Sequence, residues 1–84
     1  MKYLYFSAPW CGPCKQLAPK MEEVAETVTV EKILVDENQK ITQQFGVRNI
    51  PTVVLIDEND KEIERFLGVN SVEFYLEKYN EHVN

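Results

Sequence analysis

The sequence changes from a strand pattern to a helix pattern within residues 3–15, YLYFSAPWCGPCK. The aromatic run Tyr3–Phe6 suits a short buried strand that ends before Pro9. The segment 11–28 carries an apolar residue at every third or fourth position, which predicts an amphipathic helix; these residues are Leu17, Met21, Val24 and Val28. We therefore expect the two cysteines, Cys11 and Cys14, to lie where a strand ends and a helix begins.

The rest of the chain continues to alternate between strands and helices. Apolar runs predict strands over 30–35, 51–56 and 63–67, and a short helix is expected over 39–45. Asn70 followed by Glu73 resembles a capping box at the start of a last helix that ends near Val83. The order strand, helix, strand, helix, strand, strand, helix predicts an α/β fold, with one mixed four-stranded sheet and three helices distributed over both of its faces.

Length and composition limit the possible classes of protein. A chain of 84 residues predicts a single domain over 1–84. Its 9 basic and 14 acidic residues give a net charge of −5, which argues against a nucleic-acid partner. No apolar run reaches the 18 residues of a membrane span, and the short apolar start runs into Pro9 too early for a signal peptide. We expect a cytoplasmic monomer without a membrane partner.

The two cysteines are the residues that carry chemistry. At a helix N-terminus, the unpaired N–H groups and the helix dipole should lower the pKa of the Cys11 thiol, whereas Cys14 should be more buried and less ionised. This asymmetry favours thiol–disulfide exchange. Three other readings stay open: a structural disulfide across a very short loop, an inert buried pair, and a zinc site. Zinc is disfavoured because His82 is the only other good ligand, so we expect no metal.

The segment Ala8–Lys15, APWCGPCK, followed by Ile50-Pro51-Thr52, resembles the thioredoxin family. The resemblance covers nearly the whole chain and implies a thioredoxin-like fold in a minimal form, without the N-terminal strand and helix of longer members. It implies that Cys11 is the nucleophile and Cys14 the resolving thiol. The redox-active Cys11–Cys14 disulfide would then replace any bound cofactor.

The resemblance also implies which residues surround the cysteines. Pro51 would be a cis-proline facing the disulfide, and an apolar surface around it would contact substrate proteins. The residues implied for substrate binding or support are Trp10, Gly12, Pro13, Ile50, Pro51 and Gly68. Simple packing is the competing interpretation for Trp10 and Ile50, and a plain turn at the end of a strand is the competing interpretation for Gly68.

One position departs from the family pattern. Thioredoxins usually carry a buried aspartate six residues before the nucleophile, where it relays a proton to the resolving thiol, and this chain has Tyr5 there. Tyr5 is therefore either part of an altered proton relay or a packing residue. Lys32 matches the basic neighbour of that aspartate, although an ordinary surface lysine is an equally simple interpretation.

The resemblance implies a protein-disulfide reductase that reduces client proteins through a mixed disulfide. A thioredoxin reductase would supply the electrons, and ribonucleotide reductase is a candidate client. Two alternatives remain. One is a glutaredoxin-like, glutathione-dependent reductase, which would normally have tyrosine within C-P-Y-C and valine in place of Ile50. The other is a non-catalytic binding module with the same fold.

Overall fold

The computed structural model describes residues 1–83, which contain seven elements. They are β1 (Lys2–Ser7), α1 (Gly12–Val24), β2 (Val30–Leu34), α2 (Gln39–Gln44), β3 (Thr52–Ile56), β4 (Glu62–Leu67) and α3 (Val72–Val83). Their order confirms the predicted α/β arrangement. None of the helices within residues 1–83 has the length and apolar character needed to cross a membrane.

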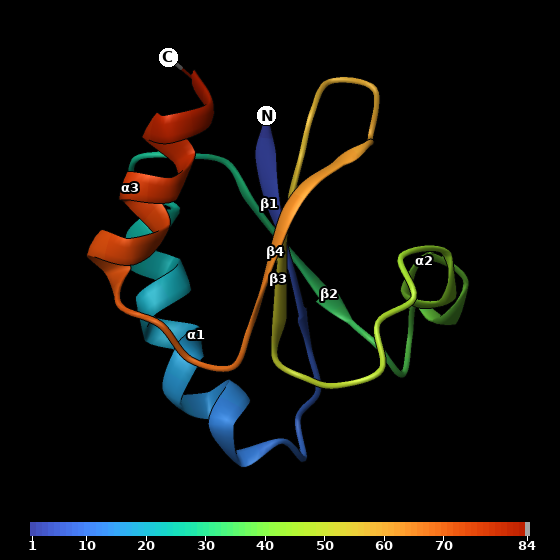
Figure 1. Ribbon diagram of the computed structural model, residues 1–84. Helices are drawn as coiled ribbons and strands as arrows, with labels where there is room; N and C mark the ends of the chain where they lie inside the picture. The colour runs from blue at the N-terminus through green and yellow to red at the C-terminus, as the bar shows by residue number, and fades with distance from the viewer. Residues whose placement is uncertain (84) are drawn as a thin grey trace.

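The four strands form one mixed sheet in the order β2-β1-β3-β4. The strand β1 runs parallel to β2 and antiparallel to β3, and β4 returns antiparallel to β3 as the second strand of a hairpin. Helices α1 and α3 lie on one face of the sheet and α2 lies on the other (Figure 1). Because β1 and β3 are the inner strands, each is covered on both faces, and every residue of β3 is buried.

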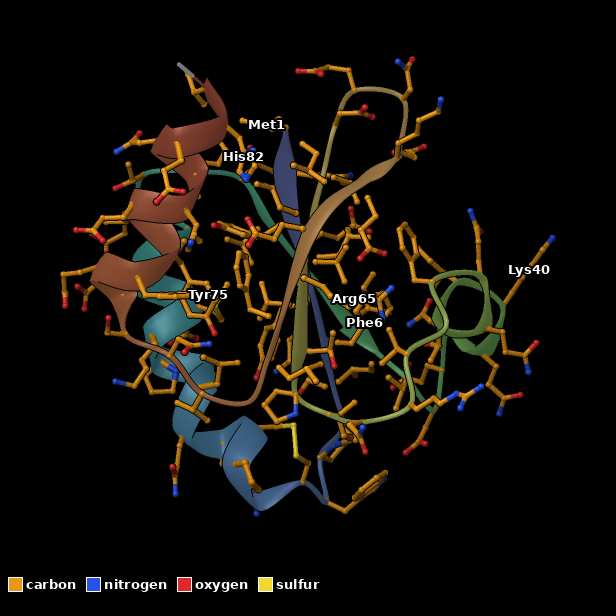
Figure 2. The ribbon with its side chains drawn as sticks, in the orientation of Figure 1. Met1, Phe6, Lys40, Arg65, Tyr75 and His82 are labelled. Carbon is orange, nitrogen blue, oxygen red and sulfur yellow. A yellow bond between two sulfur atoms is a disulfide. The ribbon has the colours of Figure 1, made fainter. Side chains whose placement is uncertain are left out.

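Alternation along β1 divides its side chains between two cores. Tyr3 and Tyr5 enter the core under α1 and α3, whereas Leu4 and Phe6 enter the core on the α2 face. Figure 2 shows Tyr75 of α3 directed toward the sheet on the first of these faces. The inner strand β1 therefore contributes side chains that pack under the helices on both faces of the sheet.

The first helix is shorter than the periodicity predicted. The segment 11–28 was expected to be helical throughout, but α1 ends at Val24. The next residues form a turn in which the Thr27 and Val28 N–H groups both donate to the Val24 carbonyl oxygen. Two threonines and a β-branched valine follow in 27–29, and such residues are weak helix formers. Val28 is nevertheless buried, so the apolar spacing predicted its burial correctly and its secondary structure wrongly.

The start of α3 also differs from the prediction. Asn70 was expected to cap this helix, but Ser71 does so, because its hydroxyl oxygen accepts the Phe74 N–H at 3.1 Å. The Asn70 side chain donates instead to the Tyr75 hydroxyl at 3.4 Å. Serine and asparagine are comparable caps, so sequence alone does not choose between adjacent candidates.

Strand register brings three connecting segments together at one end of the sheet. The end of β1 lies beside the start of β3, where Phe6 is paired with Thr52, and the end of β4 lies beside the same residue, where Thr52 is paired with Leu67. The chain that follows β1, the chain that precedes β3 and the chain that follows β4 must therefore meet. Figure 2 shows a disulfide at this end of the molecule, while Met1 and His82 lie at the opposite end.

Candidate active site

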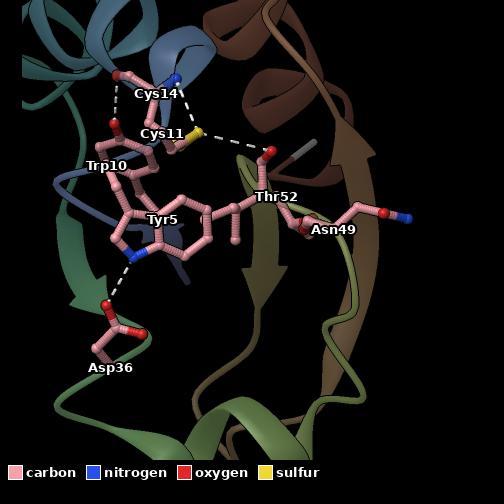
Figure 3. The surroundings of a disulfide bond; sticks show 8 residues. Tyr5, Trp10, Cys11, Cys14, Asp36, Asn49 and Thr52 are labelled. Carbon is pink, nitrogen blue, oxygen red and sulfur yellow. Dashed lines mark hydrogen bonds between the residues drawn. A yellow bond between two sulfur atoms is a disulfide. The ribbon is translucent and has the colours of Figure 1, made fainter.

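Cys11 and Cys14 are joined by a disulfide at the N-terminus of α1 (Figure 3). Cys11 is the N-cap residue, and its sulfur accepts the backbone N–H of Cys14 at 3.2 Å. Both side chains are almost fully buried, at 5% and 2% exposure, so the expected difference in burial between them is small in the disulfide form. The free N–H groups at a helix start and the helix dipole both stabilise negative charge on a sulfur placed there.

The loop before β3 packs against the disulfide. The Ile50–Pro51 peptide bond is cis, and the Ile50 carbonyl oxygen lies 3.8 Å from Cys11 Sγ. A disulfide sulfur carries no proton, so this is a contact in the oxidised form, and the Cys11 thiol becomes a possible donor to Ile50 only after reduction. Pro51 is buried and Ile50 is half-buried against the cysteines. The structure thus places Ile50 beside the cysteines, and Pro51 follows it in the same loop.

Trp10 lies immediately before Cys11 and is 68% exposed. Its indole N–H donates to a carboxylate oxygen of Asp36 at 2.8 Å, which fixes the ring across the end of β2 (Figure 3). No motif in the sequence indicates Asp36 as a site residue. An aspartate directly after a strand parallel to β1 lies at the same sheet end as Trp10, and that topological argument could have found it.

The turn after β4 completes the surroundings of the disulfide. Gly68 has a φ of +77° and donates its N–H to the Pro51 carbonyl oxygen at 3.0 Å. On either side of it, Leu67 is 62% exposed and Val69 is 37% exposed. Leu67 was not predicted as a site residue, although alternation next to the buried Phe66 indicates that Leu67 faces solvent.

Gly12 and Pro13 form the first turn of α1 and are both exposed. A Cβ atom added to Gly12 would meet no other atom within 4 Å, so space does not require a glycine at this position. Pro13 occupies a position where a helix has no use for the missing N–H.

Tyr5 is 2% exposed and reaches Cys14, but through the backbone. Its hydroxyl donates to the Cys14 carbonyl oxygen at 2.9 Å (Figure 3). Lys32 lies over the ring of Tyr5, with its ammonium nitrogen 5.9 Å from the centre of the ring. A groove of about 310 Å³ is lined by both residues together with Cys14 and Leu34. Lys32 is thus near Tyr5 and exposed, as either interpretation of it would allow.

His82 does not lie near the cysteines. It belongs to the last turn of α3 and its Nε2 lies 3.0 Å from Glu64 of β4. Within residues 1–83, no three His, Cys, Asp or Glu side chains come together as a metal site would need. Cys11 and Cys14 themselves form a disulfide, and formation or cleavage of that bond transfers two electrons.

Comparison with known proteins agrees with this geometry. The sequence pattern of the Thioredoxin family matches residues 2–80. The chain is 45% identical to a thioredoxin of Alicyclobacillus acidocaldarius over 75% of its own length, and it spans 63% of that relative. It is 38% identical to a thioredoxin of Bacillus subtilis, covering 93% of this chain and 78% of that one. The chain therefore spans less than two thirds of the first of these curated relatives.

Solved structures show the same fold. The structure of thioredoxin 1 from Thermosipho africanus superimposes with a TM-score of 0.83 at 34% identity, covering 100% of this chain and 99% of that one. A mutant thioredoxin from Halobacterium salinarum gives a TM-score of 0.83 at 37% identity, covering 90% of this chain and 68% of that one. From the sequence match, the fold and the paired cysteines together, the chain belongs to the thioredoxin family.

Proposed function

We propose that this protein is a protein-disulfide reductase that works through Cys11 and Cys14. The observation that carries the proposal is the position of Cys11 Sγ at the N-cap of α1, where it accepts the Cys14 N–H at 3.2 Å. The same N–H and helix dipole stabilise a Cys11 thiolate once the disulfide is reduced, and the thiolate is the nucleophile in disulfide exchange.

The reaction has two exchange steps. The Cys11 thiolate attacks one sulfur of a client disulfide, which forms a mixed disulfide and releases the other client sulfur as a thiolate. The Cys14 thiolate then attacks Cys11 Sγ, which forms the Cys11–Cys14 bond and releases the second client sulfur. The two client thiolates take up protons from solvent. The client gains two electrons and the cysteine pair loses them, so no bound cofactor is needed.

Apolar side chains around the disulfide supply a contact surface for clients. Trp10 and Leu67 are exposed, and Ile50 packs on the two cysteines. Exposed apolar residues that gather around a reactive group are typical of an interaction site. A thioredoxin reductase is the proposed electron donor, and ribonucleotide reductase is one candidate client, in a cytoplasmic setting.

Cysteine replacement tests the proposal directly. We expect Cys14→Ser to accumulate client proteins as mixed disulfides through Cys11, because the second exchange step is removed. Cys11→Ser should trap none, and both variants should lose the reduction of insulin in the presence of dithiothreitol that the unaltered protein catalyses. Far-UV circular dichroism of both variants controls for folding.

Three results would count against the proposal. Equal trapping by the two variants would contradict the assignment of Cys11 as nucleophile. Reduction of glutathione mixed disulfides without reduction of insulin would favour a glutaredoxin-like enzyme. Activity in neither assay would favour a binding module.

A further inference from the structure

We infer that the Tyr5 hydroxyl is a positioning group for the resolving cysteine, acting through the Cys14 carbonyl oxygen. The inference rests on the proposed exchange reaction, since it concerns the step in which Cys14 closes the disulfide. Its basis is the buried hydrogen bond of 2.9 Å between the Tyr5 hydroxyl and that carbonyl. Tyr5 belongs to β1, an inner strand of the sheet, so the bond ties the first turn of α1 to a strand that is paired on both sides.

Two features weaken the backbone hydrogen bonding of the first turns of α1. Pro19 has no N–H, so the helical hydrogen bond that residue 19 would make to the Lys15 carbonyl is missing. The Lys15 N–H donates to the Cys11 carbonyl at 3.3 Å, which is a long bond. The Tyr5 hydroxyl supplies a donor from outside the helix at the Cys14 carbonyl, one residue before the Lys15 carbonyl that lacks its helical donor.

The tether matters most when the cysteines are not joined. In the disulfide form the sulfur–sulfur bond itself holds Cys14 beside Cys11. In the dithiol and in the mixed disulfide that bond is absent, and the Cys14 backbone depends on the helix, on packing and on Tyr5. A turn held in place keeps Cys14 Sγ close to Cys11 Sγ, which raises the effective concentration of one thiol at the other.

Two measurable quantities follow from that effective concentration. One is the equilibrium constant for forming the Cys11–Cys14 disulfide against glutathione, and the other is the rate at which Cys14 releases a mixed disulfide. The Tyr5 hydrogen bond and the disulfide constrain the same turn, so each favours the formation of the other. Removal of the Tyr5 hydroxyl therefore lowers the equilibrium constant by no more than the factor that corresponds to the free energy of its hydrogen bond. That limit is about fivefold, which corresponds to about 1 kcal/mol.

The chain offers a matched control in Tyr3. It lies on the same strand and the same face, it is fully buried, and its hydroxyl donates to a backbone carbonyl, that of Tyr75 in α3, at 2.6 Å. Tyr3→Phe and Tyr5→Phe therefore remove the same kind of bond from the same strand. Only Tyr5→Phe removes it from a cysteine.

The experiment titrates each purified protein with reduced and oxidised glutathione and measures the fraction of Cys11–Cys14 disulfide. We expect Tyr5→Phe to lower the equilibrium constant two- to fivefold and to slow release of a glutathione mixed disulfide by a similar factor. Tyr3→Phe should leave both unchanged. If Tyr5 only packs, its variant will lose stability equally in the oxidised and reduced forms, and the equilibrium constant will not move, which would overturn the inference.

A second measurement keeps the inference testable if Tyr5→Phe is poorly stable. The carbonyl carbon of Cys14 should shift upfield in the NMR spectrum of Tyr5→Phe relative to the unaltered protein, while the Tyr75 carbonyl carbon stays in place, and Tyr3→Phe should give the reverse. Absence of a Cys14 shift would show that the bond does not form in solution. Because the glutathione titration uses no client protein, its outcome is independent of whether the chain reduces insulin.

Discussion

Tyr3 and Tyr5 lie two residues apart on β1, face the same core and are both buried, yet they serve different ends of the molecule. The ring of Tyr3 packs edge-on against Tyr75, with ring centres 5.8 Å apart, and lies near Phe66 and Tyr79. Tyr5 has the lysine at position 32 and the first turn of α1 as neighbours. Their hydroxyls hold α3 and α1 respectively.

The difference shows that two residues of one strand can have different roles: Tyr3 stabilises the core, and Tyr5 contacts the redox site. Burial raises the pKa of the Tyr3 hydroxyl well above its ordinary value, so this group stays neutral and serves as a donor within an aromatic core. The Tyr5 hydroxyl makes the same kind of bond next to a reactive residue. Stability should therefore depend more on the Tyr3 end and redox behaviour more on the Tyr5 end.

The largest effect on stability is expected from removal of the Tyr3 side chain. Tyr3→Ala should lower the free energy of unfolding by about 3–5 kcal/mol, because it empties a fully buried ring site and leaves the Tyr75 carbonyl without its donor. Urea unfolding followed by circular dichroism measures the loss. The glutathione equilibrium constant of the folded fraction should not change, and a change as large as that expected for Tyr5→Phe would erase the distinction between the two ends.

Replacement of two glycines is expected to have an effect of intermediate size on stability. Gly68 and Gly46 both have positive φ, of +77° and +62°, and an added Cβ would meet no atom within 4 Å at either position. Replacement of either by alanine should therefore cost about 1–2 kcal/mol of stability from backbone strain alone. Only Gly68 bonds to Pro51 beside the disulfide, so only Gly68→Ala should slow insulin reduction. Equal slowing by Gly46→Ala would show that the loss reflects stability and not the site.

The smallest expected effect lies in the hairpin turn at the Tyr3 end. The Asp57 carboxylate accepts the N–H groups of Lys61 and Asn59, and these bonds lower its pKa below the ordinary value of 3.8. A pKa that is lower in the folded chain adds stability above pH 3.8 and loses it as the pH falls through the folded value. Asp57→Ala should thus be slightly less stable than the unaltered protein at pH 7, and the gap should narrow at about pH 2.5. A gap that is the same at both pH values in urea unfolding would assign the effect to something other than this carboxylate.

Most of the fold was predictable because local patterns and topology agreed. Aromatic and β-branched runs identified all four strands. The end of α1 and the cap of α3 were not predictable, because Val28 keeps its apolar spacing after the helix has ended and Ser71 competes with Asn70. Local sequence determines which residues are buried better than it determines which backbone groups are bonded.

The site residues that belong to a sequence motif were predictable. The contacts between residues far apart in the sequence were not. The cysteines and the Ile50-Pro51 loop were found from sequence, and the structure brings them within 3.8 Å of each other. The bond between Trp10 and Asp36 was missed because its partners are 26 residues apart and belong to no common motif. The sequence did not indicate that Tyr5 donates to a backbone carbonyl, because a strand pattern does not specify which acceptor a buried phenol meets.

The outer edge of β2 has a consequence for how copies of this protein meet. β2 is an edge strand, and an edge strand offers unpaired backbone groups to a strand of another chain, including a second copy of this protein. If two copies joined antiparallel about a two-fold axis, the register that pairs Val30 with Leu34 would set each Lys32 directly opposite the other. Like charges placed opposite one another across strands oppose pairing. Lys32 at the centre of β2 therefore disfavours extension of the sheet by a second copy in this register.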